Sequence, residues 1–206
     1  MSGYIDVSNL KITKDLQDNW RPIRVEVIRL FGLIGDVLKP NGPMMGQNGR
    51  YVESMGVDMY SGENYSTHLW VHPEMLDDRE KEICFAPGVP EKRVWRQQQC
   101  PTLTKILKPY AVRGLLGNVG INKLMPGSKI NPHYGVSSAF FRMHLGLETD
   151  PGATFYIKDE PSYTWKDGEV MAFRDGDVLH WVEHNGTKRR IIIAIDLRDE
   201  VLKETI

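Results

Sequence analysis

The chain has 206 residues, enough for one domain with its own hydrophobic core. Its 26 basic and 27 acidic residues nearly cancel, which argues against nucleic acid or an anionic membrane as a partner. The polar first residues contain no secretory signal, no apolar run is long enough to span a membrane, and Cys84 and Cys100 form no disulfide framework. We therefore expect a cytoplasmic protein that binds a small-molecule or peptide substrate; the oligomeric state does not follow.

Residues 1–114 combine helical periodicity with polar loops. Apolar residues at helical spacing predict a helix over 22–38, which Pro40 ends. The glycine-rich stretch 41–66 is either a lid over a pocket or a plain loop. A second short helix is expected between Pro101 and Pro109.

From residue 115 onward, short β-branched and aromatic segments alternate with turn signals such as Asp-Gly and Asn-Gly. These segments are 115–125, 138–147, 153–158, 163–165, 169–174, 178–184 and 188–197. Such spacing predicts an antiparallel jelly roll of about eight strands. We expect a mainly β fold in which residues 115–206 form the core and the helical and loop region 1–114 packs on it, as one integrated domain.

Two pairs of histidines have the spacing of a zinc motif. His68 and His72 lie four residues apart, as do His180 and His184, and on a helix each pair would share one face. Neither pair has the glutamate of an HExxH motif, and four residues of a strand span about 13 Å, too far for one ion. We therefore expect His68, His72 and His184 to be surface or loop histidines.

Other polar residues lie inside predicted strands. Arg142 and His144 are two residues apart, so on a strand they share one face while their apolar neighbours occupy the other. Arg190 begins the apolar strand "RRIIIAID", and a buried guanidinium there needs an anionic partner. Taken singly, each of these residues is also typical of a strand edge or rim.

Taken in order, the pieces "PHYG", "FRMHLGL", "WKDG", "FRDGD", His180 and "RRIIIAID" resemble the aspartyl/asparaginyl β-hydroxylase family of Fe(II)- and 2-oxoglutarate-dependent dioxygenases. The resemblance covers roughly residues 122–196, and its most specific parts are "RMHLGL" and the spacing from His180 to Arg190. It implies a double-stranded β-helix, the cupin-like jelly roll. It also implies a hydroxylase that uses Fe(II), 2-oxoglutarate and O₂ and releases succinate and CO₂.

The resemblance assigns roles to individual residues. His133 and His180 would bind iron through neutral imidazoles, which suit Fe(II). Arg190 would pair with the distal carboxylate of 2-oxoglutarate, a task for a rigid guanidinium fork. Asn122, where the family has a serine, would add a hydrogen bond to that carboxylate, and His144 would contact the cosubstrate near the metal.

Two further positions bear on the metal and on the substrate. Most non-haem oxygenases place a carboxylate two residues after the first histidine, and here that position is Gly135, which the resembled family shares. The metal-coordination position that this carboxylate would fill is expected to bind water in a hydroxylase and chloride in a halogenase. Arg142 would hold an anionic group of the substrate, but Phe140 replaces an arginine of the peptide-hydroxylating members. The substrate is therefore an Asp- or Asn-type residue, a free amino acid or a less acidic metabolite.

A non-catalytic, cupin-like binding module is the alternative from a different functional class. It is disfavoured because His133, His180 and Arg190 are all present. Trp165 is expected to pack rather than to form a substrate platform, and Asp196 to be a structural hydrogen-bond partner.

Overall fold

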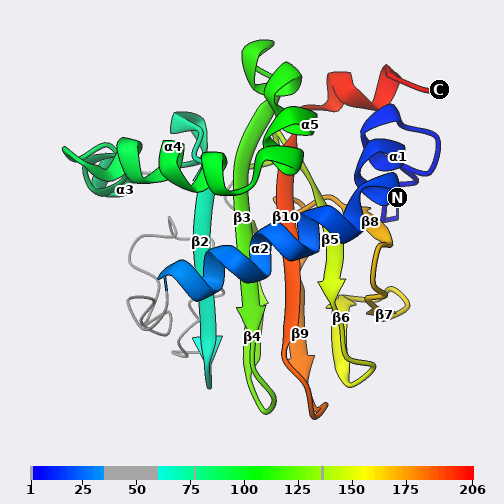
Figure 1. The fold of residues 1–206 in the computed structure, drawn as a ribbon. Coiled ribbons are helices and arrows are strands. Elements are labelled where there is room, and N and C mark those ends of the chain that lie inside the picture. Colours follow the sequence, from blue (N-terminus) through cyan, green and yellow to red (C-terminus); the bar gives the residue numbers. More distant parts are fainter. Residues whose placement is uncertain (1, 35–59, 77, 136) are drawn as a thin grey trace.

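The computed structural model describes residues 2–34, 60–76, 78–135 and 137–206. Two five-stranded antiparallel sheets lie one behind the other, and helices cover the outer face of the larger sheet (Figure 1). This arrangement confirms the predicted mainly β, double-stranded β-helix fold with a helical N-terminal part. In the described part of the chain, no helix has the length and apolarity needed to cross a membrane.

The larger sheet has the order β2-β3-β10-β5-β8, and the smaller sheet has the order β1-β4-β9-β6-β7. The strands of the larger sheet are β2 (Asn64–Trp70), β3 (Leu116–Leu124), β10 (Arg190–Leu197), β5 (Phe141–Glu148) and β8 (Val170–Phe173). Those of the smaller sheet are β1 (Tyr60–Ser61), β4 (Lys129–His133), β9 (His180–His184), β6 (Ala153–Ile157) and β7 (Tyr163–Thr164). The region expected to hold only helices and loops thus adds one strand to each sheet, and β4 was not among the predicted strands.

The helices are α1 (Lys11–Asp18), α2 (Trp20–Ile34), α3 (Asp78–Cys84), α4 (Val89–Gln99) and α5 (Pro101–Val112), with 3-10 turns η3 (Pro73–Met75) and η4 (Asp199–Lys203). The helix predicted to end at Pro109 continues to Val112, because proline removes only its own amide donor and its carbonyl still accepts from Arg113 N at 3.3 Å. Residues 35–38 of the first predicted helix and 41–59 of the possible lid lie outside the described residues. Of the rest of that stretch, 60–61 belong to β1 and 64–66 to β2.

Strand alternation divides the larger sheet into two faces. In β10, the odd-numbered residues Ile191, Ile193 and Ile195 join the core beneath the helices. The even-numbered residues Arg190 and Ile192 face the space between the sheets instead. Helix α2 crosses the covered face (Figure 1) and contributes the buried side chains Ile23, Val27 and Leu30. Each such side chain stabilises the fold by roughly 1.5–3 kcal/mol through burial.

Candidate metal and cosubstrate site

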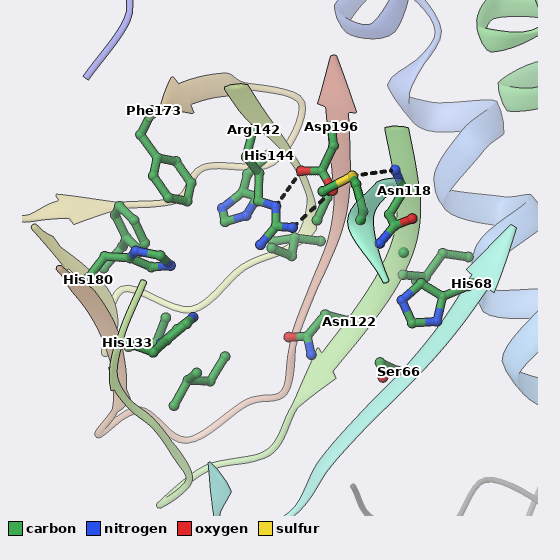
Figure 2. Close-up of a pocket in the computed structure, with 18 of the residues that line it drawn as sticks. Ser66, His68, Asn118, Asn122, His133, Arg142, His144, Phe173, His180 and Asp196 are labelled. Carbon is green, nitrogen blue, oxygen red and sulfur yellow. Dashed lines mark hydrogen bonds and ion pairs between the residues drawn. The ribbon is translucent and has the colours of Figure 1, made fainter. Parts of the chain in front are cut away.

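A cavity of about 250 Å³ lies between the two sheets, and Figure 2 shows its lining. It is lined by all six residues that the resemblance singled out: Asn122, His133, Arg142, His144, His180 and Arg190. They come from β3, β4, β5, β9 and β10. The fold therefore brings together every predicted site residue.

His133 and His180 are directly opposite one another in the pairing of β4 with β9. Their ring centroids are 4.2 Å apart, and both side chains are buried. The Nδ1 of His133 lies 2.8 Å from the Asn131 carbonyl, and that of His180 lies 2.9 Å from the Val178 carbonyl. Because a carbonyl only accepts, each Nδ1 carries a proton and donates to it, and each Nε2 is left outside these backbone hydrogen bonds. Burial lowers the pKa of His133 to about 3, so its imidazole is neutral at physiological pH.

The Asp175 carboxylate lies beside this pair, in the turn between β8 and β9. Its Oδ1 is 3.3 Å from His180 Nε2 and 2.8 Å from Arg142 Nη1. A Cβ placed on Gly135 would lie 1.7 Å from Asp175 Oδ2, so this carboxylate fills the space that a longer side chain at 135 would need. Burial alone would raise its pKa, but the Arg142 cation and His180 hold the pKa of Asp175 below the usual range.

Asp175 has no role in the sequence-based site, although it belongs to the matching "FRDGD" piece. The sequence offered one indication of its importance, because Asp175 lies five residues before the candidate metal ligand His180. The sequence gives no indication of how the turn folds, so it could not show that this carboxylate reaches the space beside Gly135.

Arg142, predicted to bind a substrate anion, makes ion pairs within the protein. Its Nε and Nη2 donate to the two oxygens of Asp196 at 2.7 and 3.0 Å, and its Nη1 donates to Asp175. Both carboxylates are about 2% exposed. Asp196 therefore has the structural partner role expected of it, and one guanidinium is shared by two buried carboxylates. Burial raises the pKa of Asp196, and the Arg142 cation opposes that rise.

Arg190 is 1% exposed and lies over the face of Trp165, with 4.6 Å between the guanidinium carbon and the ring centroid. Its Nη2 donates to Asn122 Oδ1, while Asn122 Nδ2 donates to Asn64 Oδ1 at 2.7 Å. Both ends of the Asn122 amide thus bond to protein groups, and the residue holds the guanidinium in place. Trp165 packs in the core as expected, beneath that guanidinium.

His144 lies on β5 between the histidine pair and Arg142. Its ring meets Phe155 and Phe173 edge-on, at centroid distances of 5.9 and 5.3 Å. Burial lowers the pKa of His144 well below its usual value, so the imidazole is neutral. Its Nδ1 is buried without a hydrogen-bond partner, an arrangement that proteins usually avoid unless a ligand supplies the partner.

The donor set fits Fe(II) with a dicarboxylate cosubstrate. His133 and His180 present their Nε2 atoms side by side, and Asp175 Oδ2, next to them, is buried without a partner. A buried guanidinium, Arg190, suits a carboxylate. Over the described residues, no three His, Cys, Asp or Glu side chains form a group that could hold a metal ion.

The remaining histidines differ in part from expectation. His184 was expected at the surface, but it is fully buried, and its Nε2 donates to the Lys188 carbonyl at 2.6 Å. His68 lies on β2, is exposed as expected, and lines the cavity, where the Arg142 cation lowers its pKa. His72 accepts from Glu74 N and so caps η3.

Comparison with known proteins agrees with this geometry. The family model described as aspartyl/asparaginyl beta-hydroxylase matches residues 55–200. The chain belongs to the aspartyl/asparaginyl beta-hydroxylase family. The resemblance inferred from the sequence is thereby confirmed, and hydroxylases give the family its name.

Aspartate beta-hydroxylase domain-containing protein 1 of Mus musculus is 30% identical over 48% of this chain and 29% of its own. Aspartyl/asparaginyl beta-hydroxylase of Homo sapiens is 22% identical over 95% of this chain and 21% of its own. The chain therefore spans less than a third of these relatives. Among solved structures, a Pseudomonas putida prolyl-4-hydroxylase aligns over 88% of this chain and 86% of that chain, with a TM-score of 0.46 and 14% identity.

Proposed function

We propose that this family member is an Fe(II)- and 2-oxoglutarate-dependent hydroxylase of an unactivated C–H bond in an amino acid, a peptide residue or a related small metabolite. The observation that carries the proposal is the cross-strand pair of His133 and His180, whose Nε2 atoms face the same cavity as the buried Arg190. When bound together, Fe(II) and 2-oxoglutarate activate O₂ and oxidise the substrate carbon, with release of succinate and CO₂.

The protein's own residues bind and orient. His133 and His180 would hold the metal with their Nε2 atoms, because each Nδ1 proton is committed to a backbone carbonyl. Arg190, held by Asn122 and Trp165, would pair with the distal carboxylate of the cosubstrate. The unpartnered Nδ1 of His144 would accept or donate one hydrogen bond near the metal.

Asp175 separates this proposal from the halogenase alternative. A halide bound beside Gly135 would lie next to a buried carboxylate, and two like charges in a buried site disfavour one another. Hydroxylation is therefore the reaction that the site supports better.

The proposal is tested by succinate release with Fe(II), ascorbate and pooled amino acids and peptides, beside a calorimetric titration of 2-oxoglutarate. His180→Ala and Arg190→Met should each lower succinate release at least a hundredfold, and Arg190→Met should also weaken 2-oxoglutarate binding at least tenfold. Arg189→Met is the matched control, because Arg189 is exposed and pairs with Glu148 on the other side of the strand. Absence of both turnover and iron-dependent 2-oxoglutarate binding in the wild type would favour the cupin-like binding module instead.

A further inference from the structure

The cavity has a second side, away from the metal pair. Figure 2 shows His68 and Asn118 across the cavity from His133 and His180, with Arg142 between them. Val71, Met75 and Leu76, which follow β2 in the chain, also line the cavity, and Met75 Sδ accepts from Asn118 N at 3.3 Å. A substrate that approaches the metal therefore contacts this surface.

The polar groups of this side are an imidazole and an amide. The cations of Arg142, Arg96 and Arg93 disfavour the protonated form of His68 and lower its pKa, although its side chain is exposed. Asn118 Oδ1 accepts from His72 N at 2.8 Å, which leaves the amide NH₂ as the end turned to the cavity (Figure 2). Neutral donors and acceptors recognise amides and hydroxyls without requiring a charge.

The charges lining the cavity balance without a substrate anion. Arg142 is paired with Asp175 and Asp196, and Arg190 lies where the cosubstrate carboxylate would bind. The two charges of Fe(II) would match those of 2-oxoglutarate. A substrate carboxylate near Arg142 would therefore be repelled by Asp175 and Asp196. It would have no cation of its own there, because Arg142 already pairs with both of these carboxylates.

Two further cations affect His68 from outside the cavity. Arg96 donates to the His68 carbonyl at 3.2 Å and Arg93 donates to the Cys84 carbonyl at 2.7 Å. Neither guanidinium lines the cavity. They lower the pKa of His68, which keeps this side neutral, but they do not present a donor to a ligand there.

We infer that the part of the substrate bound between His68 and Arg142 is uncharged and mainly apolar, with a neutral group such as an amide for Asn118. This inference rests on the proposed function. The inference disfavours an acidic side chain as the substrate. Such a side chain would need a cation, and the Arg142 cation is already bound by Asp175 and Asp196.

The first test measures binding without turnover. The twenty N-acetyl amino-acid amides are titrated by thermal shift against the protein loaded with Zn(II) and the unreactive analogue N-oxalylglycine. An uncharged member should bind best, and the asparagine and glutamine amides should bind at least tenfold more tightly than the isosteric aspartate and glutamate amides. Equal or tighter binding of the acidic members, or no saturation by any uncharged member, would overturn the inference.

The second test changes the charge balance. Asp196→Asn removes one of the two anions on Arg142 and should shift the aspartate-to-asparagine preference at least tenfold toward aspartate. Leu76→Lys adds a cation to the apolar surface and should also shift the preference toward aspartate. This second variant keeps the test valid if Asp196→Asn folds poorly. Asp199→Asn is the control, because Asp199 pairs with Arg174 on the surface. An unchanged preference in both variants would place substrate recognition elsewhere.

The two proposals fail in different ways. Loss of the hydroxylase proposal would appear as no iron-dependent 2-oxoglutarate binding and no succinate release. Loss of the substrate inference would appear as a preference for acidic ligands in a protein that binds 2-oxoglutarate normally.

Discussion

Gly135 and Asp175 act as one unit, in which the absence of a side chain at one position makes room for a carboxylate from the other. The glycine amide donates to the Asp175 carbonyl at 2.7 Å, and a Cβ at 135 would overlap the carboxylate. The buried carboxylate then reaches both His180 and Arg142. An aspartate introduced at 135 would therefore displace an existing anion rather than fill an empty space.

Replacing Gly135 by alanine is expected to lower the free energy of unfolding by about 1–3 kcal/mol, because the added methyl group pushes Asp175 off its partners. Co(II) affinity should fall in the same variant. Urea unfolding and Co(II) absorption titration measure the two effects. Gly32→Ala is the control: nothing lies within 4 Å of its Cβ position in α2, and alanine favours a helix. Equal destabilisation by the two changes would remove the steric argument.

The face of the strand on which the predicted site residues lie was predictable, but their contacts were not. Arg142, His144 and Arg190 lie on the face that strand alternation predicts. The pairing of Arg142 with Asp175 and Asp196 joins a strand, a turn and another strand, and no local pattern specifies which carboxylate reaches an arginine across a sheet. For the same reason His184 was wrongly assigned to the surface.

One turn joins β9 of the smaller sheet, which begins at His180, to β10 of the larger sheet, which begins at Arg190. This turn therefore sets the relative position of the proposed metal ligand and the proposed cosubstrate cation, and Asp150, in the turn after β5, secures it. Its Oδ2 accepts from Thr187 N at 3.1 Å and Lys188 N at 2.8 Å, and its Oδ1 accepts from Gly152 N at 2.7 Å. One carboxylate thus joins two turns that are distant in sequence.

Asp150→Ala should lower the free energy of unfolding by about 2–4 kcal/mol, since it leaves three backbone donors without their acceptor. Weaker 2-oxoglutarate binding should accompany this loss, because Arg190 follows the turn directly. Thermal unfolding and calorimetry measure both. Asp167→Ala serves as the comparison: its carboxylate accepts from Thr149 in an exposed turn, and its loss should have the smaller effect. The reverse order of effects would contradict this view of the turn.

Strands with an apolar sequence between clear turn signals were predicted. Strands that form only because an adjacent strand pairs with them were not. The strands over 141–148 and 190–197 are apolar with clear turn signals, and both are present. Strand β4 contains Pro132 and few apolar residues, and β2 is polar along much of its length, so neither resembles an isolated strand. They form because a partner strand supplies hydrogen bonds.

Over the whole molecule, the buried histidines link stability to pH. Burial lowers the pKa of His133 to about 3 and that of His144 well below its usual value, whereas in the unfolded chain both titrate near 6.5. Between those values the unfolded state binds more protons than the folded state. Stability is therefore complete above about pH 6.5 and decreases as the pH falls below it.

The metal-free protein should lose free energy of unfolding steadily from pH 7 to pH 4, as measured by urea unfolding at a series of pH values. His144→Gln should reduce the slope, because a glutamine cannot take up a proton in the unfolded state. The opposite sign, with stability rising toward pH 4, would mean that these imidazoles are charged in the folded protein and would remove the argument for neutral metal ligands.

The register of β4 against β9 has a consequence for how the chain assembles. His133 and His180 meet only in one alignment of the two strands, and a slip by one residue turns one of them to the opposite face. A bound ion would join two distant points of the chain much as a covalent cross-link does, reducing the entropy of the open chain. Metal capture would then select the correctly aligned sheet during folding and discard misaligned ones.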